Sequence, residues 1–80
     1  MSIEIDVRVV DEDGEGVAGA RVFMSYPFTQ QEDYTDGDGW VHFERPETMH
    51  GGVRTDIFIN GEKVADDVWI EGEESFSFTI

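Results

Sequence analysis

Apolar and polar residues alternate with a period of two along most of this chain. In residues 3–9, every odd position holds isoleucine or valine, and charged side chains lie between them. This spacing puts the apolar side chains on one face of an extended strand, so it predicts a half-buried β-strand. The same alternation predicts strands in four later segments, which are residues 20–26, 40–44, 53–59 and 76–80.

Less regular segments and turns separate these strands. Residues 28–34 are polar and predict a loop that leads into a short strand. Residues 63–70 predict a return strand that a bulge at Asp66 and Asp67 interrupts. Asn60-Gly61 is the two-residue signal of a type I′ hairpin, in which both positions need a positive φ. Further turns or loops rich in Asp, Gly or Glu are expected at residues 11–16, 36–39, 45–52 and 71–73.

Seven short strands without any helical run predict an all-β fold, a seven-stranded antiparallel sandwich in one domain of residues 1–80. Composition supports this fold class, because leucine is absent while valine, isoleucine and phenylalanine are frequent. Strand parity predicts which residues form the core: Val7, Val9, Val22, Val41, Phe43, Ile57, Ile59, Phe76 and Phe78.

Four large aromatic residues fall on the opposite, outward parity, namely Phe23, Trp40, Phe58 and Trp69. Either loops cover these side chains or they form a contact surface, because large exposed apolar patches mark interaction sites. In the second case the expected centre is Trp40, beside His42 and near Arg54. The candidate interaction surface is therefore Phe23, Trp40, His42, Arg54, Phe58 and Trp69.

Two motifs in the first half of the chain resemble a known family. Gly19-Ala20-Arg21-Val22 follows an apolar strand and an acidic turn, and Thr35-Asp36-Gly37-Asp38-Gly39-Trp40-Val41-His42-Phe43 comes later. The pattern resembles the carboxypeptidase regulatory-like domains, which share a transthyretin-like (prealbumin-like) sandwich. The resemblance implies Greek-key topology and carries no activity of its own. The second half departs from the family pattern, and the Tyr-Arg-Gly-Ser ending of the transthyretin-type hydrolases is absent.

Charge limits the partners that we expect. The 80 residues hold 19 acidic and five basic side chains, a net charge of −14, which argues against direct binding to nucleic acid or to an anionic membrane. Neither a signal peptide nor a long apolar segment is visible, so a cytoplasmic location is expected. The acids are spread along the chain, as in proteins of salt-adapted organisms. A compact acidic protein could instead mimic nucleic acid toward a basic partner.

Candidate chemistry is sparse. The segments 11–14 and 36–39 resemble fragments of calcium loops, but neither has the complete spacing of an EF-hand, and solvated turns explain them better. The histidines, His42 and His50, have no cysteine beside them, so a zinc site would need carboxylate ligands. We expect both histidines to be exposed and unliganded, and we assign no catalytic, cofactor-binding or metal-binding residue.

The sequence therefore favours a function without catalysis. We expect an accessory or protein-interaction domain from a salt-adapted organism. Its partner is an unidentified protein, and a weak homodimer is the other association that fits. The alternative is an acidic nucleic-acid mimic that binds a basic DNA- or RNA-binding protein. No cofactor is expected in either case.

Overall fold

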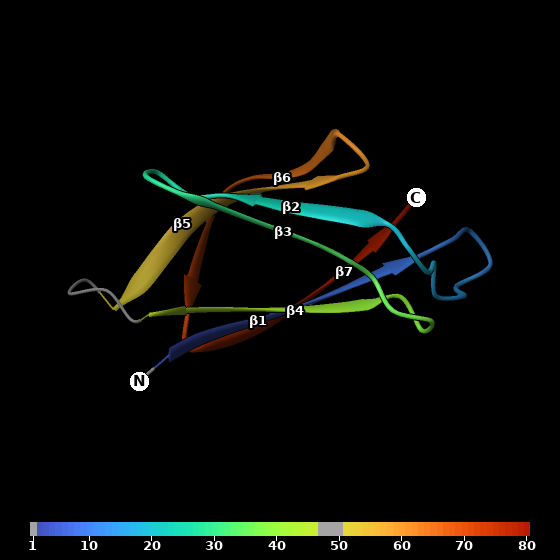
Figure 1. The fold of residues 1–80 in the computed structure, drawn as a ribbon, viewed down its shortest axis with the longest axis horizontal. Coiled ribbons are helices and arrows are strands. Elements are labelled where there is room, and N and C mark those ends of the chain that lie inside the picture. The colour runs from blue at the N-terminus through green and yellow to red at the C-terminus, as the bar shows by residue number, and fades with distance from the viewer. Residues whose placement is uncertain (1, 47–50) are drawn as a thin grey trace.

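The chain folds into two β-sheets that pack face to face (Figure 1). The computed structural model describes residues 2–46 and 51–80, and no helix occurs among them. The seven strands are β1 (Ser2–Val10), β2 (Arg21–Ser25), β3 (Gln30–Tyr34), β4 (Trp40–Pro46), β5 (Gly52–Ile59), β6 (Glu62–Glu71) and β7 (Glu73–Thr79). The predictions of an all-β fold and of seven strands are therefore confirmed.

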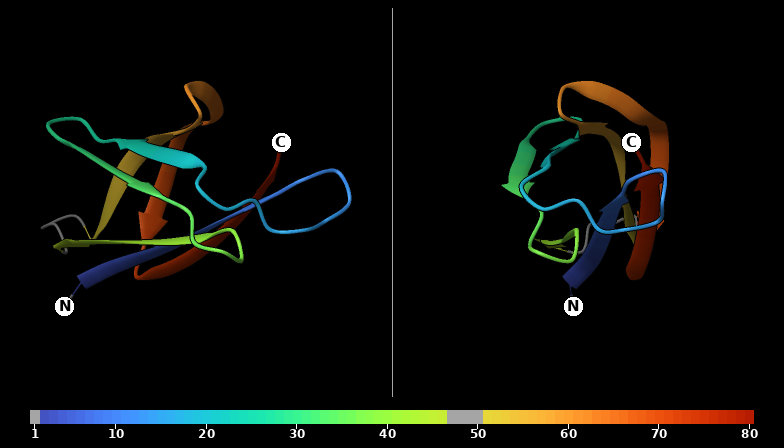
Figure 2. Two further views of the ribbon diagram at one scale, coloured as in Figure 1. Left: turned by 45° about the vertical axis from the view of Figure 1, so that its right-hand side comes forward. Right: turned by 90° about the vertical axis from the view of Figure 1, so that its right-hand side faces the viewer.

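The strands divide unequally between the two sheets. One sheet has the order β4-β1-β7 and the other the order β3-β2-β5-β6. Figure 2 shows β1 in blue between β4 and the red β7. β1 is antiparallel to β4 but parallel to β7, so the prediction of a wholly antiparallel sandwich is wrong at this pair. Alternation determines which face of a strand is buried, but it is the same for either strand direction.

The interior is built from the inward faces predicted by parity. Val7, Val9, Val22 and Ile57 have no exposed surface, and Phe43 is 5% exposed. Val41 and Ile59 are also buried as predicted, whereas Phe76 and Phe78 are only half-buried. The two phenylalanine rings stack at 6.2 Å between centroids. Both lie on β7, which has a neighbour on one side only, and this explains their incomplete burial.

Two acidic turns meet at one end of the sandwich. The Asp11 carboxylate accepts hydrogen bonds from the backbone N–H groups of Asp13 and Glu15, at 2.9 and 3.0 Å. Asp36 does the same for Asp38 and Trp40, also at 2.9 and 3.0 Å. These carboxylates therefore close their own turns, which supports the interpretation as turns rather than as calcium loops.

The same two turns approach each other through glycines. A Cβ atom on Gly16 would collide with the backbone carbonyl of Asp38, and one on Gly39 would collide with that of Val9. Gly39 also has a φ of 87°, which favours glycine. Gly39, which lies within the second family-like motif, is therefore required by close backbone packing as well as by conformation.

The acidic pair on β6 forms the predicted bulge. The register of β5 and β6 shifts between Thr55 and Ile57, opposite Asp66 and Asp67. Asp67 has a φ of 54°, and its backbone N–H donates to the Asp56 carboxylate at 2.8 Å. This hydrogen bond lowers the pKa of Asp56. The bulge is thus supported by a carboxylate from the neighbouring strand.

The turn between β5 and β6 supplies a first stability prediction. Asn60 and Gly61 have φ values of 52° and 86°, as the predicted type I′ hairpin requires. Replacing Gly61 by valine should cost more than ~1 kcal/mol of unfolding free energy, because a β-branched residue is strained at positive φ. The measurement is the urea midpoint. Gly37→Val is the control, since Gly37 lies in open space without a positive φ. Equal midpoints for Gly61→Val and the unmodified protein would contradict this role of the turn.

Candidate functional site

The six residues of the predicted interaction surface all lie on outward positions, but they belong to two different sheets. Trp40 and His42 project from β4, on the outer face of the three-stranded sheet. The other four lie on the four-stranded sheet: Phe23 on β2, Arg54 and Phe58 on β5, and Trp69 on β6. The outer faces of a sandwich point in opposite directions. The structure therefore does not bring Trp40 and His42 together with Arg54 on one surface.

Phe23 and Phe58 form a closed aromatic pair rather than an open patch. They are cross-strand neighbours, and their rings meet edge to face with centroids 5.8 Å apart. The guanidinium of Arg21 lies 5.7 Å from the Phe23 ring, and the ammonium of Lys63 lies 5.6 Å from the Phe58 ring. Because these cations lie against the rings, both phenylalanines are half-buried.

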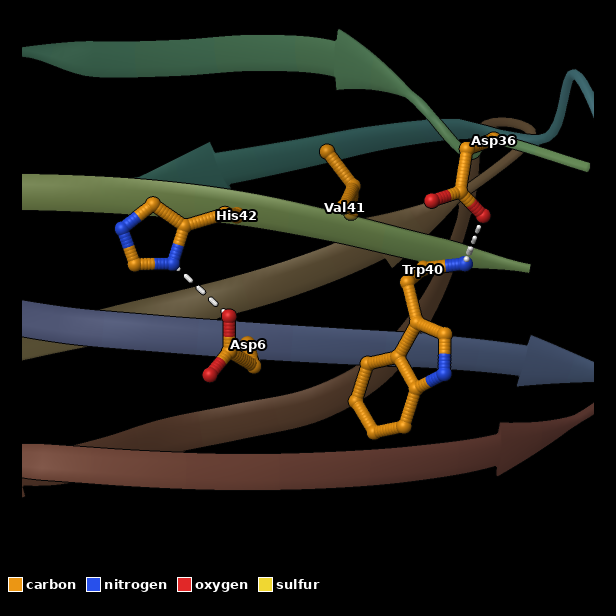
Figure 3. A pocket seen from close by; sticks show the side chains of 5 residues that line it. All are labelled: Asp6, Asp36, Trp40, Val41 and His42. Carbon is orange, nitrogen blue, oxygen red and sulfur yellow. Dashed lines mark hydrogen bonds and ion pairs between the residues drawn. The ribbon is translucent and has the colours of Figure 1, made fainter. Parts of the chain in front are cut away.

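The outer face of the three-stranded sheet carries a shallow hollow of about 440 Å³ (Figure 3). Its lining residues come from β1, β4 and the turn before β4: Asp6, Asp36, Trp40, Val41 and His42. The Trp40 side chain is 39% exposed, and the Arg8 guanidinium lies 5.7 Å from its ring centroid. This hollow is open, with an aromatic ring at one end and an imidazole at the other.

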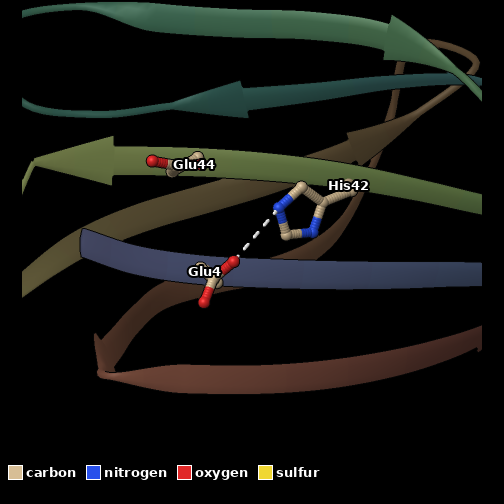
Figure 4. Close-up of side chains that lie close together, drawn as sticks. All are labelled: Glu4, His42 and Glu44. Carbon is tan, nitrogen blue, oxygen red and sulfur yellow. Dashed lines mark ion pairs between the residues drawn. The ribbon is translucent and has the colours of Figure 1, made fainter.

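His42 lies among three carboxylates. Its Nδ1 atom is 2.7 Å from Oδ1 of Asp6, and its Nε2 atom is 3.7 Å from Oε1 of Glu4. Glu44 lies two residues further along β4 (Figure 4). The hydrogen bond to Asp6 raises the pKa of His42, and the nearby charges of Asp6, Glu4 and Glu44 act in the same direction. The expectation that His42 is exposed agrees with its side-chain exposure of 48%, but its acidic surroundings were not foreseen. His50 lies outside the described residues.

A second depression is lined by the turn from β2 to β3, the end of β4 and the start of β5. Figure 1 shows these segments at one end of the sandwich. We call this depression the end cleft, and it has a volume of about 320 Å³. Its lining is largely aromatic or apolar: Tyr26, Pro27, Phe28, Thr29, Arg45, Gly52, Val53, Arg54 and Trp69. Two of these aromatic side chains reach solvent, since Phe28 is fully exposed and Trp69 is 47% exposed.

Glycine makes room for the tryptophan at the wall of the cleft. A Cβ atom on Gly52 would lie 2.7 Å from Cε2 and Cζ2 of Trp69, so the indole lies directly over the Gly52 backbone. Aromatic side chains cover glycines in this way in β-sheets. The ring is thereby held in place while nearly half of it stays open to solvent.

Arg45 lies against the aromatic floor of the cleft. Its Cζ atom is 4.7 Å from the Tyr26 ring centroid. Its Nε atom is buried and has no hydrogen-bond partner among residues 2–46 and 51–80. Burial raises the pKa of Tyr26 to about 12, and the phenol donates to Oε1 of Gln31 at 2.7 Å. Tyr26 is therefore neutral, so it offers no charge to Arg45.

Two residues of this cleft, Arg54 and Trp69, belong to the predicted interaction surface, whereas Tyr26, Phe28 and Arg45 were not predicted to take part in a site. Tyr26 has the parity of a core residue, and residues 45–52 were assigned to a loop. In the structure Arg45 and Pro46 extend β4, and Gly52 begins β5. The available signal was the combination of Tyr26-Pro27-Phe28 at one strand end with Arg45-Pro46 at another.

Comparisons with known proteins support the fold and leave the family open. No protein-family profile matches the chain, and no curated protein matches it. A solved structure that resembles it is the dioxygenase domain of a dioxygenase carbohydrate-binding protein fusion from the cellulolytic bacterium Streptomyces sp. SirexAA-E. The TM-score is 0.63 at 10% sequence identity, over 99% of this chain and 79% of that one. At this identity the likeness concerns the β-rich fold alone. Among the described residues, no helix is long and apolar enough to span a membrane.

Proposed function

We propose that this domain is a non-catalytic interaction module that binds a partner protein through the end cleft. The observation that carries the proposal is the buried Nε of Arg45, which has no hydrogen-bond partner in the described part of the chain and lies beside an open aromatic wall. Aromatic residues and arginine dominate the binding energy of protein interfaces. The cleft has both, whereas the Phe23–Phe58 pair is covered by its own neighbouring cations.

The expected occupant is a segment of the partner that carries an apolar side chain next to a carboxylate. The apolar group would fill the space between Trp69 and Phe28, where both rings are exposed. The carboxylate would pair with Arg45, because a guanidinium presents several N–H donors to an oxyanion. Arg54, at the rim, already pairs with Asp67 at 2.9 Å. A strongly acidic domain thus places two of its five cations at one cleft.

We also propose that the domain belongs with the transthyretin-like sandwiches, of the carboxypeptidase regulatory-like kind. The support is that the motif residues have structural roles in this chain. Ala20 and Val22 are buried, Thr35 is buried and accepts the Ala20 N–H at 2.9 Å, and Gly39 packs against a backbone. Such roles explain why these residue types recur at this spacing.

The test captures the partner by photo-crosslinking and then measures its affinity. A photo-reactive residue at position 28 should crosslink a protein in native lysate, and the same residue at position 23 should not. With the purified partner, Trp69→Ala and Arg45→Gln should each weaken binding about tenfold or more. Trp40→Ala and Arg21→Gln are matched controls, because they make the same changes away from the cleft.

The outcome of the controls decides between the surfaces. A loss of binding with Trp40→Ala, together with unchanged binding by Trp69→Ala, would move the interface to the other sheet and refute the cleft. The salt dependence of partner binding distinguishes this proposal from the alternative function, a nucleic-acid mimic. A mimic holds a basic partner at 0.15 M salt and releases it steeply as salt rises. A partner bound by the apolar cleft should remain bound at 2 M.

A further inference from the structure

We infer that Glu4, His42 and Glu44 form a binding site for a divalent transition-metal ion on the outer face of the three-stranded sheet, with Asp6 as the residue that positions His42. This site is independent of the end cleft, which lies on different residues. Neither the sequence patterns nor the proposed interaction function requires it.

Cross-strand register brings the four side chains together. In the antiparallel pair of β1 and β4, Glu4 lies opposite Glu44, and Asp6 lies opposite His42. All four have outward parity, so they form a two-by-two array on one surface (Figures 3 and 4). Sequence positions far apart in the chain thus supply neighbouring nitrogen and oxygen donors.

The donor atoms converge closely enough to share one ion. One atom each from Glu4, His42 and Glu44 lies within 4.8 Å of the others. Zinc is bound by nitrogen and oxygen donors at about 2.0–2.2 Å, so two ligand atoms on one ion are at most about 4.4 Å apart. His42 and Glu44 are exposed and Glu4 is half-exposed, so small rotations of these side chains can bring the donor atoms within the distance that one zinc ion requires.

The hydrogen bonds around the cluster orient the ligands. Asp6 engages Nδ1 of His42 at 2.7 Å, which leaves Nε2 on the side of Glu4 (Figure 4). A carboxylate on the far nitrogen is the common outer partner of a metal-binding histidine. The Ser2 hydroxyl donates to Oε1 of Glu44 at 3.0 Å, which fixes that carboxylate. β1 therefore contributes one ligand carboxylate and both orienting groups, and β4 contributes the other two ligands.

Charge favours a cation at this position. Like charges directly opposite in a sheet are destabilising, as for Glu4 and Glu44. In the described part of the chain, lysine and arginine form their ion pairs elsewhere, with Glu32, Asp56, Asp66 and Asp67. A divalent ion would neutralise the opposed glutamates. Because one donor is an imidazole, the site should prefer zinc or another nitrogen-binding metal to magnesium.

The test is a titration of the metal-free 80-residue chain with Zn²⁺ and separately with Mg²⁺, in 1 M NaCl to screen unspecific binding. Calorimetry gives the affinity, and the imidazole resonances of His42 report contact. His42→Gln and Glu44→Gln should each weaken Zn²⁺ binding at least about tenfold. His50→Gln removes the other histidine and Asp13→Asn removes one acid from a distant turn, so both should stay within about twofold of the unmodified protein.

Asp6 is tested by the tautomer of His42 as well as by affinity. Asp6→Ala should weaken Zn²⁺ binding about 10–100-fold and should change the ¹⁵N shifts that report which ring nitrogen carries the proton. Asp6→Asn retains an acceptor oxygen, so it should partly restore both the Zn²⁺ affinity and the ¹⁵N shifts of the unmodified protein. Unfolding midpoints confirm that each variant is folded. Equal Zn²⁺ affinity in His42→Gln and in the unmodified protein, or Mg²⁺ binding as tight as Zn²⁺ binding, would overturn the inference.

Discussion

Replacing Phe43 by alanine should cost about 3–5 kcal/mol of unfolding free energy, which is the usual loss for a fully buried phenylalanine. Phe43 is 5% exposed on β4, and it lies opposite the fully buried Ile5 of β1. Small domains have a total stability of only about 5–15 kcal/mol. The variant should therefore be largely unfolded wherever the unmodified domain is only marginally stable.

Denaturant unfolding at molar salt measures this loss, since the unmodified protein should be most stable there. Phe28→Ala is the matched control, because it makes the same chemical change at a fully exposed side chain. We expect its midpoint to stay unchanged. A loss below about 1 kcal/mol for Phe43→Ala would mean that the core does not depend on this ring.

Stability should also rise steeply with salt, well beyond the physiological range. A sphere of radius ~15 Å with 14 net charges has a gross self-energy of about 27 kcal/mol in unscreened water. Screening lengths of ~8 Å at 0.15 M and ~3 Å at 1 M reduce this to about 9 and about 4–5 kcal/mol. The unfolded chain repels itself too, so only part of the difference, about 2 kcal/mol, should stabilise the folded state.

Salt also screens the attractive ion pairs, but this should reduce the stability of the folded state only slightly. The lysine and arginine ion pairs among the described residues lie on exposed side chains, and such pairs contribute only about 0–1 kcal/mol each. At ~4–8 °C per kcal/mol, Tm should increase by about 10 °C between 0.15 M and 2 M NaCl. KCl should act equally if screening is the cause. A flat Tm would contradict the interpretation of the acidic composition as an adaptation to salt.

Alternation in the sequence predicts well which face of a strand is buried, but it does not predict which strands lie next to each other. The odd-numbered residues of 3–9 and of 53–59 are buried, as their parity requires. Parity does not reveal which sheet a strand joins, and so Trp40 and Trp69 were grouped although they lie on different sheets. The direction of β7 was missed for the same reason, because its side chains alternate identically in a parallel and in an antiparallel pair.

The candidate sites were predicted only in part, because both depend on contacts between distant segments. His42 was expected to be exposed, and it is, but the carboxylates beside it belong largely to β1. Arg45 was assigned to a loop, since Pro46 and the glycines after it suggest a strand end. Only the folded arrangement brings Arg45 over Tyr26 and beside Trp69. Local patterns describe a strand, whereas these sites are properties of strand pairing.

The pairing of β1 with β4 and β7 has a consequence for how the domain folds. The four-stranded sheet contains two local hairpins, β2 with β3 and β5 with β6, whose loops are cheap to close. The three-stranded sheet has no hairpin, since all three of its strands come from separate parts of the chain. High contact order slows folding, so this sheet should assemble last. An ion held between β1 and β4 would then act on the slowest step, by joining two strands that no turn connects.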